Sequence, residues 1–164
     1  MRTVKESKLV NSRILLGLLG WFGLTFLAAW IGSQFSPGDW YTQLAKPSWT
    51  PPAWVFAPVW TLLYVLMAIG AWLVWKRGGV LAARLPLALF VVQLALNAAW
   101  SWLFFGLKMP GVAFGELLLL LSFIVATTAL FMREHIMAGI LMVPYVLWVC
   151  FAAALNYSIW RMNS

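Results

Sequence analysis

The sequence predicts an all-α membrane protein, folded as a bundle of five transmembrane helices. Hydrophobic residues make up 64% of its 164 residues and charged residues only 9%, whereas soluble domains carry roughly 25% charged residues. The hydrophobic residues form five runs of about 20 residues, long enough for spanning helices and too long for barrel strands. Backbone polar groups in lipid must be satisfied within the protein, so we expect each run to be helical.

The five predicted spans follow a basic tail at residues 1–12. The flank of the first span resembles that of a signal peptide, but the run is long and ends in Trp30 and Ile31, so we expect it to be retained. Short connections make successive helices antiparallel neighbours, and we interpret residues 13–161 as one transmembrane domain. The expected spans are residues 13–33, 53–75, 83–105, 109–132 and 136–160.

The longest connection, residues 34–52, is predicted to be a lid over one end of the bundle. Its four prolines exclude a continuous helix, although a short interfacial helix is expected near residues 39–45. Loops of this length are often functional. Tryptophan is also enriched at membrane interfaces, so the loop tryptophans have two interpretations, lid or interfacial belt. The lid candidates are Trp40, Pro47, Trp49 and Pro51.

The basic residues are distributed unequally between the two ends of the predicted bundle. The N-terminal side has Arg2, Lys5, Lys8, Arg13, Lys76, Arg77, Arg84 and Arg133, and the other side has Lys46, Lys108 and Arg161. We expect an integral membrane protein of bacterial type, and for an inner-membrane location the positive-inside rule predicts the N-terminus inside and the C-terminus and residues 34–52 outside. Because these residues occupy short loops beside apolar runs, the net charge of +7 indicates topology, and we expect no nucleic-acid partner.

Polar and aromatic side chains from four spans are predicted to converge in the outer half of the bundle. At 1.5 Å per helical residue, their depths run from about 6 Å to near the midplane. Polar groups at such depth usually face the bundle interior or a cavity, and aromatic groups with hydrogen-bonding atoms suit a flat amphipathic ligand. The amides could instead only bridge helices. The set comprises Trp60, Tyr64, Gln93, Asn97, Glu116, Trp148, Ala152 and Asn156.

No catalytic or metal-binding constellation is recognisable in the sequence. It contains no Ser–His–acid set, phosphate-binding loop or dinucleotide fingerprint. The single histidine, His135, has no partner at metal-ligand spacing, so no metal site is expected. The single cysteine, Cys150, is expected to be a small buried hydrophobic residue.

Small residues spaced four apart let helices approach closely. Such pairs include Ala28/Gly32 in the first span and Ala95/Ala99 in the third. Either pair could pack helices within the bundle or form a homodimer, and Ala95 and Ala99 are our prediction for a dimer interface.

Several motifs occur in a characteristic order between about residues 30 and 163. They are WY at 40–41, KPSWTPP at 46–52, WVFAPVWTLLY at 54–64, QLALNAAW at 93–100, FFG at 104–106, PY at 144–145, Trp148 and LNYSIWR at 155–161. Together they resemble the translocator-protein family (TspO/MBR), also known as tryptophan-rich sensory proteins or peripheral benzodiazepine receptors. The resemblance implies a five-helix bundle, usually homodimeric, with a pocket beneath the first long loop.

The resemblance also implies ligands and site residues. Family ligands include porphyrins such as protoporphyrin IX, haem, sterols, and synthetic isoquinoline carboxamides and benzodiazepines; porphyrin or haem would be a ligand, and no cofactor is obligatory. Some bacterial members are reported to degrade protoporphyrin in light through two tryptophans, which match Trp60 and Trp148. Leu155, Tyr157 and Arg161 fit a proposed sterol pattern that is weak by nature. The matching pocket positions are Trp60, Tyr64, Asn97, Trp148, Ala152 and Leu155.

Three positions depart from the vertebrate pattern. Thr50 stands in place of His, Val112 in place of Trp, and Glu116 in place of Asp. These differences lower the expected affinity for vertebrate drugs and sterols and leave the porphyrin pocket intact. We therefore predict a membrane-embedded, porphyrin-binding receptor or transporter-like protein with a sensory or regulatory role in tetrapyrrole metabolism. The alternatives are a light-dependent porphyrin-degrading enzyme and a sterol- or lipid-binding interaction protein.

Overall fold

The computed structural model describes residues 4–164, with side chains described from Ser12 onward, and this part of the chain is helical with turns and loops. Five of its helices are long and apolar enough to cross a membrane, which confirms the predicted fold class. Arg2, Lys5 and Lys8 of the predicted tail lie outside the described side chains. The elements are α1 (Val4–Ser33), α2 (Asp39–Gln43), α3 (Ala53–Ala82), α4 (Arg84–Ser101), the π-helical turn η1 (Trp102–Gly106), α5 (Pro110–Glu134) and α6 (Ile136–Met162).

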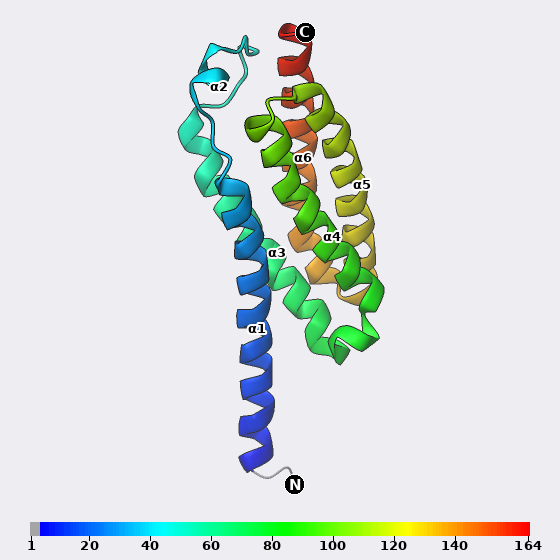
Figure 1. Ribbon diagram of the computed structural model, residues 1–164. Coiled ribbons are helices and arrows are strands. Elements are labelled where there is room, and N and C mark those ends of the chain that lie inside the picture. Colours follow the sequence, from blue (N-terminus) through cyan, green and yellow to red (C-terminus); the bar gives the residue numbers. More distant parts are fainter. Residues whose placement is uncertain (1–3) are drawn as a thin grey trace.

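The long helices form a closed ring. Neighbours in the ring are α1 and α3, α3 and α6, α6 and α5, α5 and α4, and α4 and α1. Successive long helices run in opposite directions, as the short connections predict, and α2 lies at the same end as the C-terminus (Figure 1). The N-terminal part of α1 extends beyond the other helices at the opposite end (Figure 1). We call these two ends the loop end and the basic end.

The helix boundaries follow from local chemistry. Pro110 begins α5, where its missing N–H and fixed φ are well tolerated. His135 has an extended backbone, φ −156°, and separates α5 from α6. The second span was predicted to end at residue 75, but the chain stays helical until Gly79, whose φ of 74° interrupts α3. Glycine adopts this left-handed conformation without a steric penalty.

The core consists of two hydrophobic clusters. The larger one extends along the bundle and includes Met67, Phe90, Phe131, Met142 and Tyr145, all fully buried. The smaller one lies at the loop end. It contains Phe104, Ala113, Leu155 and Ile159, with Trp40, Tyr41, Leu44 and Phe56 packed against it. The loop is therefore part of the folded structure at this end and covers the bundle.

The outer surface of the bundle is apolar, as a lipid-facing surface requires. Leu16, Leu81 and Leu147 are each more than 60% exposed. Cys150 is also exposed, so the prediction that it is buried was wrong. A spanning helix is apolar on its lipid face as well as its core face, and an apolar neighbourhood therefore does not indicate burial.

The two small-residue pairs have different surroundings. A Cβ on Gly32 would lie 3.8 Å from the Cα of Ala98 and 3.4 Å from Oγ of Ser101, so this part of α1 packs closely against α4. Ala28 is buried as well. Ala95 is exposed on α4 and Ala99 is half-buried. The first pair packs helices within the bundle, and the dimer role of the second stays a prediction.

Candidate functional site

A chain of buried hydrogen bonds links three helices, from the loop-end half of the bundle to its middle. The Tyr64 hydroxyl donates to Asn97 Oδ1 at 2.5 Å, and Asn97 Nδ2 donates to the Tyr145 hydroxyl at 3.1 Å. Tyr145 in turn donates to Gln93 Oε1 at 2.9 Å. Gln93 Nε2 lies 3.9 Å from the sulfur of Met67. These side chains are all buried, so each polar group is oriented by its neighbour.

Helical spacing explains why these residues meet. Tyr64 follows Trp60 by one turn on α3, and Asn97 follows Gln93 by one turn on α4, so each pair shares a helix face. The Trp60 ring lies 5.6 Å from the Tyr64 ring and 6.2 Å from the Tyr145 ring, measured between centroids. Burying amides and hydroxyls is costly unless they are hydrogen-bonded. The network meets this requirement and leaves an aromatic surface around a polar centre.

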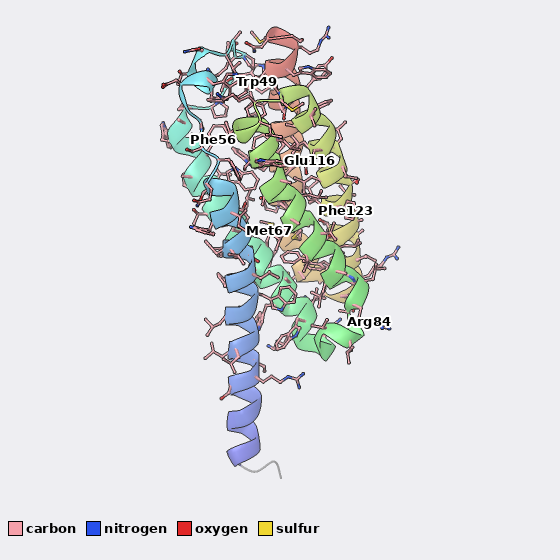
Figure 2. The ribbon with its side chains drawn as sticks, viewed as in Figure 1. Trp49, Phe56, Met67, Arg84, Glu116 and Phe123 are labelled. Atoms are coloured by element: carbon pink, nitrogen blue, oxygen red, sulfur yellow. The ribbon has the colours of Figure 1, made fainter. Side chains whose placement is uncertain are left out.

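Trp148 belongs to a second aromatic group nearer the loop. Its ring lies 5.9 Å from Phe56 of α3 and 5.4 Å from Phe151, and the lid residue Trp49 lies 5.8 Å from Phe151. Ala152, one turn beyond Trp148, packs against the main core. The loop is thus connected to Trp148 through Phe151. Figure 2 shows Trp49, Phe56 and Met67 at successive depths from the loop end.

The predicted lid, residues 34–52, contacts the bundle at Trp40 and Ala45. Trp40 packs edge-on against Phe104 at 5.9 Å. The C-terminal Asn163 accepts a hydrogen bond from the Ala45 backbone N–H at 3.0 Å and donates one to the Ala45 carbonyl at 2.9 Å. In the turn before α3, Thr50 donates twice to the Pro47 carbonyl, from its N–H and its hydroxyl. The half-buried Pro51 then leads into α3.

Tyr41 and Lys46 form a further contact within the lid. The Lys46 ammonium lies 4.8 Å from the centroid of the Tyr41 ring and donates to the carbonyls of Thr42 and Leu44. The Tyr41 ring packs against Phe105 at 5.5 Å. Burial of its hydroxyl raises the pKa of Tyr41 above its usual value. The folded lid therefore favours the neutral phenol.

Asn156 and the predicted sterol residues lie outside the hydrogen-bond chain of Tyr64, Asn97 and Tyr145. Asn156 accepts from the Trp100 indole at 3.0 Å and donates to the Pro110 carbonyl at 2.8 Å, so it bridges helices, one of the two interpretations considered. Leu155 is buried in the smaller cluster, whereas Tyr157 and Arg161 are exposed. A ligand on the outer face of α6 would meet Tyr157 and Arg161 but not Leu155.

The half-buried Glu116 has a carboxylate without a described hydrogen-bond partner. Both carboxylate oxygens are inaccessible to solvent, and neither has a hydrogen-bond partner among the described residues. Figure 2 places Glu116 in the loop-end half of the bundle. The described residues contain no group of three or more His, Cys, Asp or Glu side chains able to hold a metal ion.

Comparison with known proteins identifies the family. Residues 21–161 match the family described as TspO/MBR family. The chain belongs to the TspO/MBR family. It is 43% identical over 142 residues to the translocator protein of Homo sapiens, covering 84% of each chain. It is 44% identical over 137 residues to protein CrtK of Rhodobacter capsulatus, covering 80% of this chain and 83% of that one.

A third relative of this TspO/MBR protein is the tryptophan-rich protein TspO of Chlorobaculum tepidum. The two are 41% identical over 148 residues, covering 86% of this chain and 92% of the relative. The family match over residues 21–161 includes residues 34–52 and all or part of each of the five spanning helices. The family membership supports an integral membrane protein, and bacterial relatives exist.

Sequence reasoning missed several residues around the site. Tyr145 holds the centre of the hydrogen-bond chain, and its spacing of three residues before Trp148 placed it on the same face of α6. Phe56 and Phe151 connect Trp148 to the loop, but an aromatic residue in a spanning helix has many possible roles. Asn163 had no detectable signal, because it lies 118 residues from the loop residue that it holds.

Proposed function

We propose that this protein is a membrane receptor or transporter-like protein that binds porphyrins at its loop end, with a sensory or regulatory role in tetrapyrrole metabolism. The observation that carries the proposal is the buried chain of Tyr64, Asn97 and Tyr145 flanked by the Trp60 ring. A porphyrin is flat and aromatic, with polar groups on its edge. Aromatic rings suit its face, and an oriented amide suits its edge.

Binding requires the site to open. Tyr64 and Asn97 are less than 10% exposed, as is Leu155, so the described state is closed by its own side chains. A macrocycle would separate Trp60 from the tyrosines and take up hydrogen bonds from the amide of Asn97. The lid held by Asn163 would release first, because it covers the route from the loop end. Protoporphyrin IX and haem are the expected ligands.

The test is a titration of the purified protein with protoporphyrin IX, followed by the absorbance of the porphyrin. This readout does not depend on the number of tryptophans. Trp60→Phe, Trp148→Phe and Asn97→Ala should each weaken binding, because they remove ring area or a polar partner. Trp30→Phe is the matched control, since Trp30 is 61% exposed on the surface of α1. Unchanged affinity in all three site variants would contradict the assignment.

The position of Trp60 in this aromatic group favours a second function, light-dependent degradation of bound porphyrin. An indole can donate an electron to an excited macrocycle that packs against it. Illumination of the complex should then yield a defined new chromophore. Trp60→Phe should bind some porphyrin but lose that product. Loss of porphyrin absorbance without a defined product would indicate simple bleaching.

We further propose that the basic end faces the cytoplasm and that two copies associate through α4. Lys76, Arg77, Arg84 and Arg133 lie near helix ends on the basic side, and Arg13 of α1 lines the same cavity as Lys76 and Arg77; the positive-inside rule places such residues on the cytoplasmic side. Single cysteines at exposed ends, tested with a membrane-impermeant thiol reagent, would report orientation.

Ala95→Leu with Ala99→Leu should convert dimer to monomer in size-exclusion chromatography with light scattering.

A further inference from the structure

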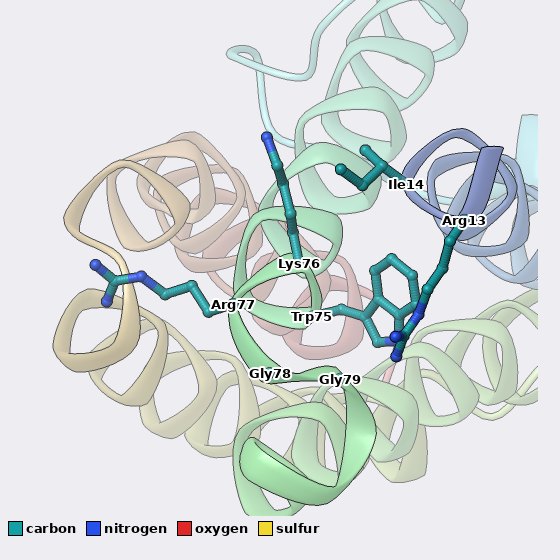
Figure 3. Close-up of a pocket in the computed structure, with 7 residues that line it drawn as sticks. All are labelled: Arg13, Ile14, Trp75, Lys76, Arg77, Gly78 and Gly79. Carbon is teal, nitrogen blue, oxygen red and sulfur yellow. The ribbon is translucent and has the colours of Figure 1, made fainter. Parts of the chain in front are cut away.

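Two neighbouring cavities lie between α1 and α3 at the basic end, away from the proposed porphyrin site. Each has a volume of about 270 Å³, and Trp75 lines both. The first is bordered by cationic and glycine residues, and the second by apolar residues and glycines. Figure 3 shows the first cavity with the Trp75 ring beside Arg13. The first is lined by Arg13, Ile14, Trp75, Lys76, Arg77, Gly78 and Gly79.

The first cavity has the chemistry of an anion site. The guanidinium carbon of Arg13 lies 6.0 Å from the Trp75 ring centroid, and the Lys76 ammonium lies 4.9 Å from the Trp72 ring. No acidic side chain lines this cavity in the described structure. Arg77 points away (Figure 3) and donates to the carbonyl of Glu134. Figure 3 shows the Lys76 ammonium directed away from the Arg13 guanidinium, so Arg13 is the cation available to a phosphate, which a guanidinium can bind in bidentate fashion.

The second cavity has the chemistry of an acyl-chain groove. It is lined by Gly17, Gly20, Trp21, Leu24 and Trp75. A Cβ on Gly20 would have no neighbour within 4 Å, so the groove is open at that point, whereas one on Gly17 would collide with the Trp75 ring. From Arg13 to Leu24 the helix rises about 16 Å. This distance is close to half of the roughly 30 Å hydrocarbon core, the depth of one leaflet.

We propose that the cleft between α1 and α3 binds one anionic glycerophospholipid from the leaflet at the basic end. Arg13 holds the phosphate, and an acyl chain lies along Gly20 and Leu24 against Trp75. The charge of the first cavity selects an anionic headgroup, and the apolar groove that continues from it selects a lipid over a soluble phosphate. The site is separate from the porphyrin site and does not depend on it.

The test of the headgroup is a titration of the full-length protein in detergent micelles, followed by native mass spectrometry. Phosphatidylglycerol and phosphatidylcholine with identical acyl chains are compared. Phosphatidylglycerol should bind more tightly, and Arg13→Gln should weaken its binding about fivefold, the effect expected of one basic residue at a lipid phosphate. Arg13→Lys should restore part of the affinity. Arg84→Gln, a charge lost at the same end but outside the cleft, should change it less than about twofold.

The test of the groove uses two glycines on the same helix. Gly20→Leu fills the groove and should weaken the binding of both lipids. Gly23→Leu, also at an open position but outside the groove, should leave their binding unchanged. Circular dichroism of each variant checks that its helices are intact. Equal affinity of the wild type for the two lipids, or equal effects of Arg13→Gln and Arg84→Gln, would overturn the headgroup assignment. If soluble glycerol phosphate binds as tightly as phosphatidylglycerol, the conclusion that the ligand is a lipid would be overturned.

Discussion

The loop end and the basic end of this TspO/MBR protein use tryptophan in opposite ways. At the loop end, Trp60 packs against Tyr64 and Tyr145, which belong to a closed hydrogen-bond chain. At the basic end, Trp75 lies beside Arg13 and forms a wall of two open cavities. The surroundings of a membrane tryptophan therefore differ between the two ends: Trp60 lies beside a buried hydrogen-bond chain, and Trp75 lies beside the guanidinium of Arg13.

The largest effect, a loss of folding stability, is expected from breaking the contact between α5 and α6 beside the turn that joins them at the basic end. A Cβ on Gly139 would lie 2.7 Å from the backbone nitrogen of Met132, so Gly139→Val forces the two helices apart. We expect a loss of about 3 kcal/mol in the free energy of unfolding, measured by thermal unfolding in detergent. Gly115→Val is the control, because a Cβ there meets nothing within 4 Å. Equal melting temperatures for the two variants would show that the contact is not tight.

A smaller effect is expected from removing the polar centre of the loop end. Asn97→Ala leaves the Tyr64 hydroxyl without its acceptor and the Tyr145 hydroxyl without its donor. We expect a loss of about 1–3 kcal/mol in the free energy of unfolding, the range for a buried group left unpaired. Thr61→Ala should cost little by the same measurement, because the exposed Thr61 hydroxyl bonds only within its own helix turn. If both variants lose the same free energy of unfolding, the hydrogen-bond network adds no stability.

Loss of the hydrogen bonds between Asn163 and Ala45 should affect only the lid and the residues next to it. Asn163→Ala removes both side-chain hydrogen bonds to the Ala45 backbone. We expect faster hydrogen exchange in α2 and at residues 44–46, with global stability lower by no more than about 1 kcal/mol. The spanning helices should exchange as in the wild type, and Ser164→Ala should change nothing. Unaltered exchange in the loop would mean that Asn163 does not hold the lid.

The smallest effect concerns the pH dependence of the lid. Burial raises the pKa of Tyr41 in the folded state, so folding favours the protonated phenol. Its contribution to stability is complete below the unfolded pKa of about 10. That contribution is lost as the pH rises from there through the folded pKa. Stability should therefore fall less steeply above pH 10 in Tyr41→Phe than in the wild type, measured by thermal unfolding. Parallel pH profiles would contradict this assignment.

Much of the fold was predictable, because the apolar runs match the bilayer thickness and short connections force antiparallel neighbours. The continuation of α3 to Gly79 was not predicted. Lys76 and Arg77 mark the end of the apolar run, but a helix can continue beyond the membrane through charged residues. The exposure of Cys150 was missed because lipid-facing and core-facing residues are equally apolar. For Cys150, the sequence pattern does not distinguish a residue that faces lipid from one that faces another helix.

Part of the candidate site was predictable as well. Depth along each helix brought Trp60, Tyr64 and Asn97 to one level, and the structure joins them. It places Leu155 in a different cluster and Tyr157 on the outer face of the same helix, which helix spacing alone would have indicated. The pairing of Asn163 with Ala45 depends on where two distant segments come together, and no local pattern encodes it.

The most direct test of the account is the protoporphyrin IX affinity of Asn97→Ala compared with that of Arg13→Gln. A porphyrin carries both a flat aromatic face and carboxylates, so in principle either end could attract it. If the loop end is the porphyrin site, Asn97→Ala weakens binding about tenfold or more, while Arg13→Gln stays within about twofold of the wild type. The reverse order, with Arg13→Gln the weaker binder, would contradict the central claim.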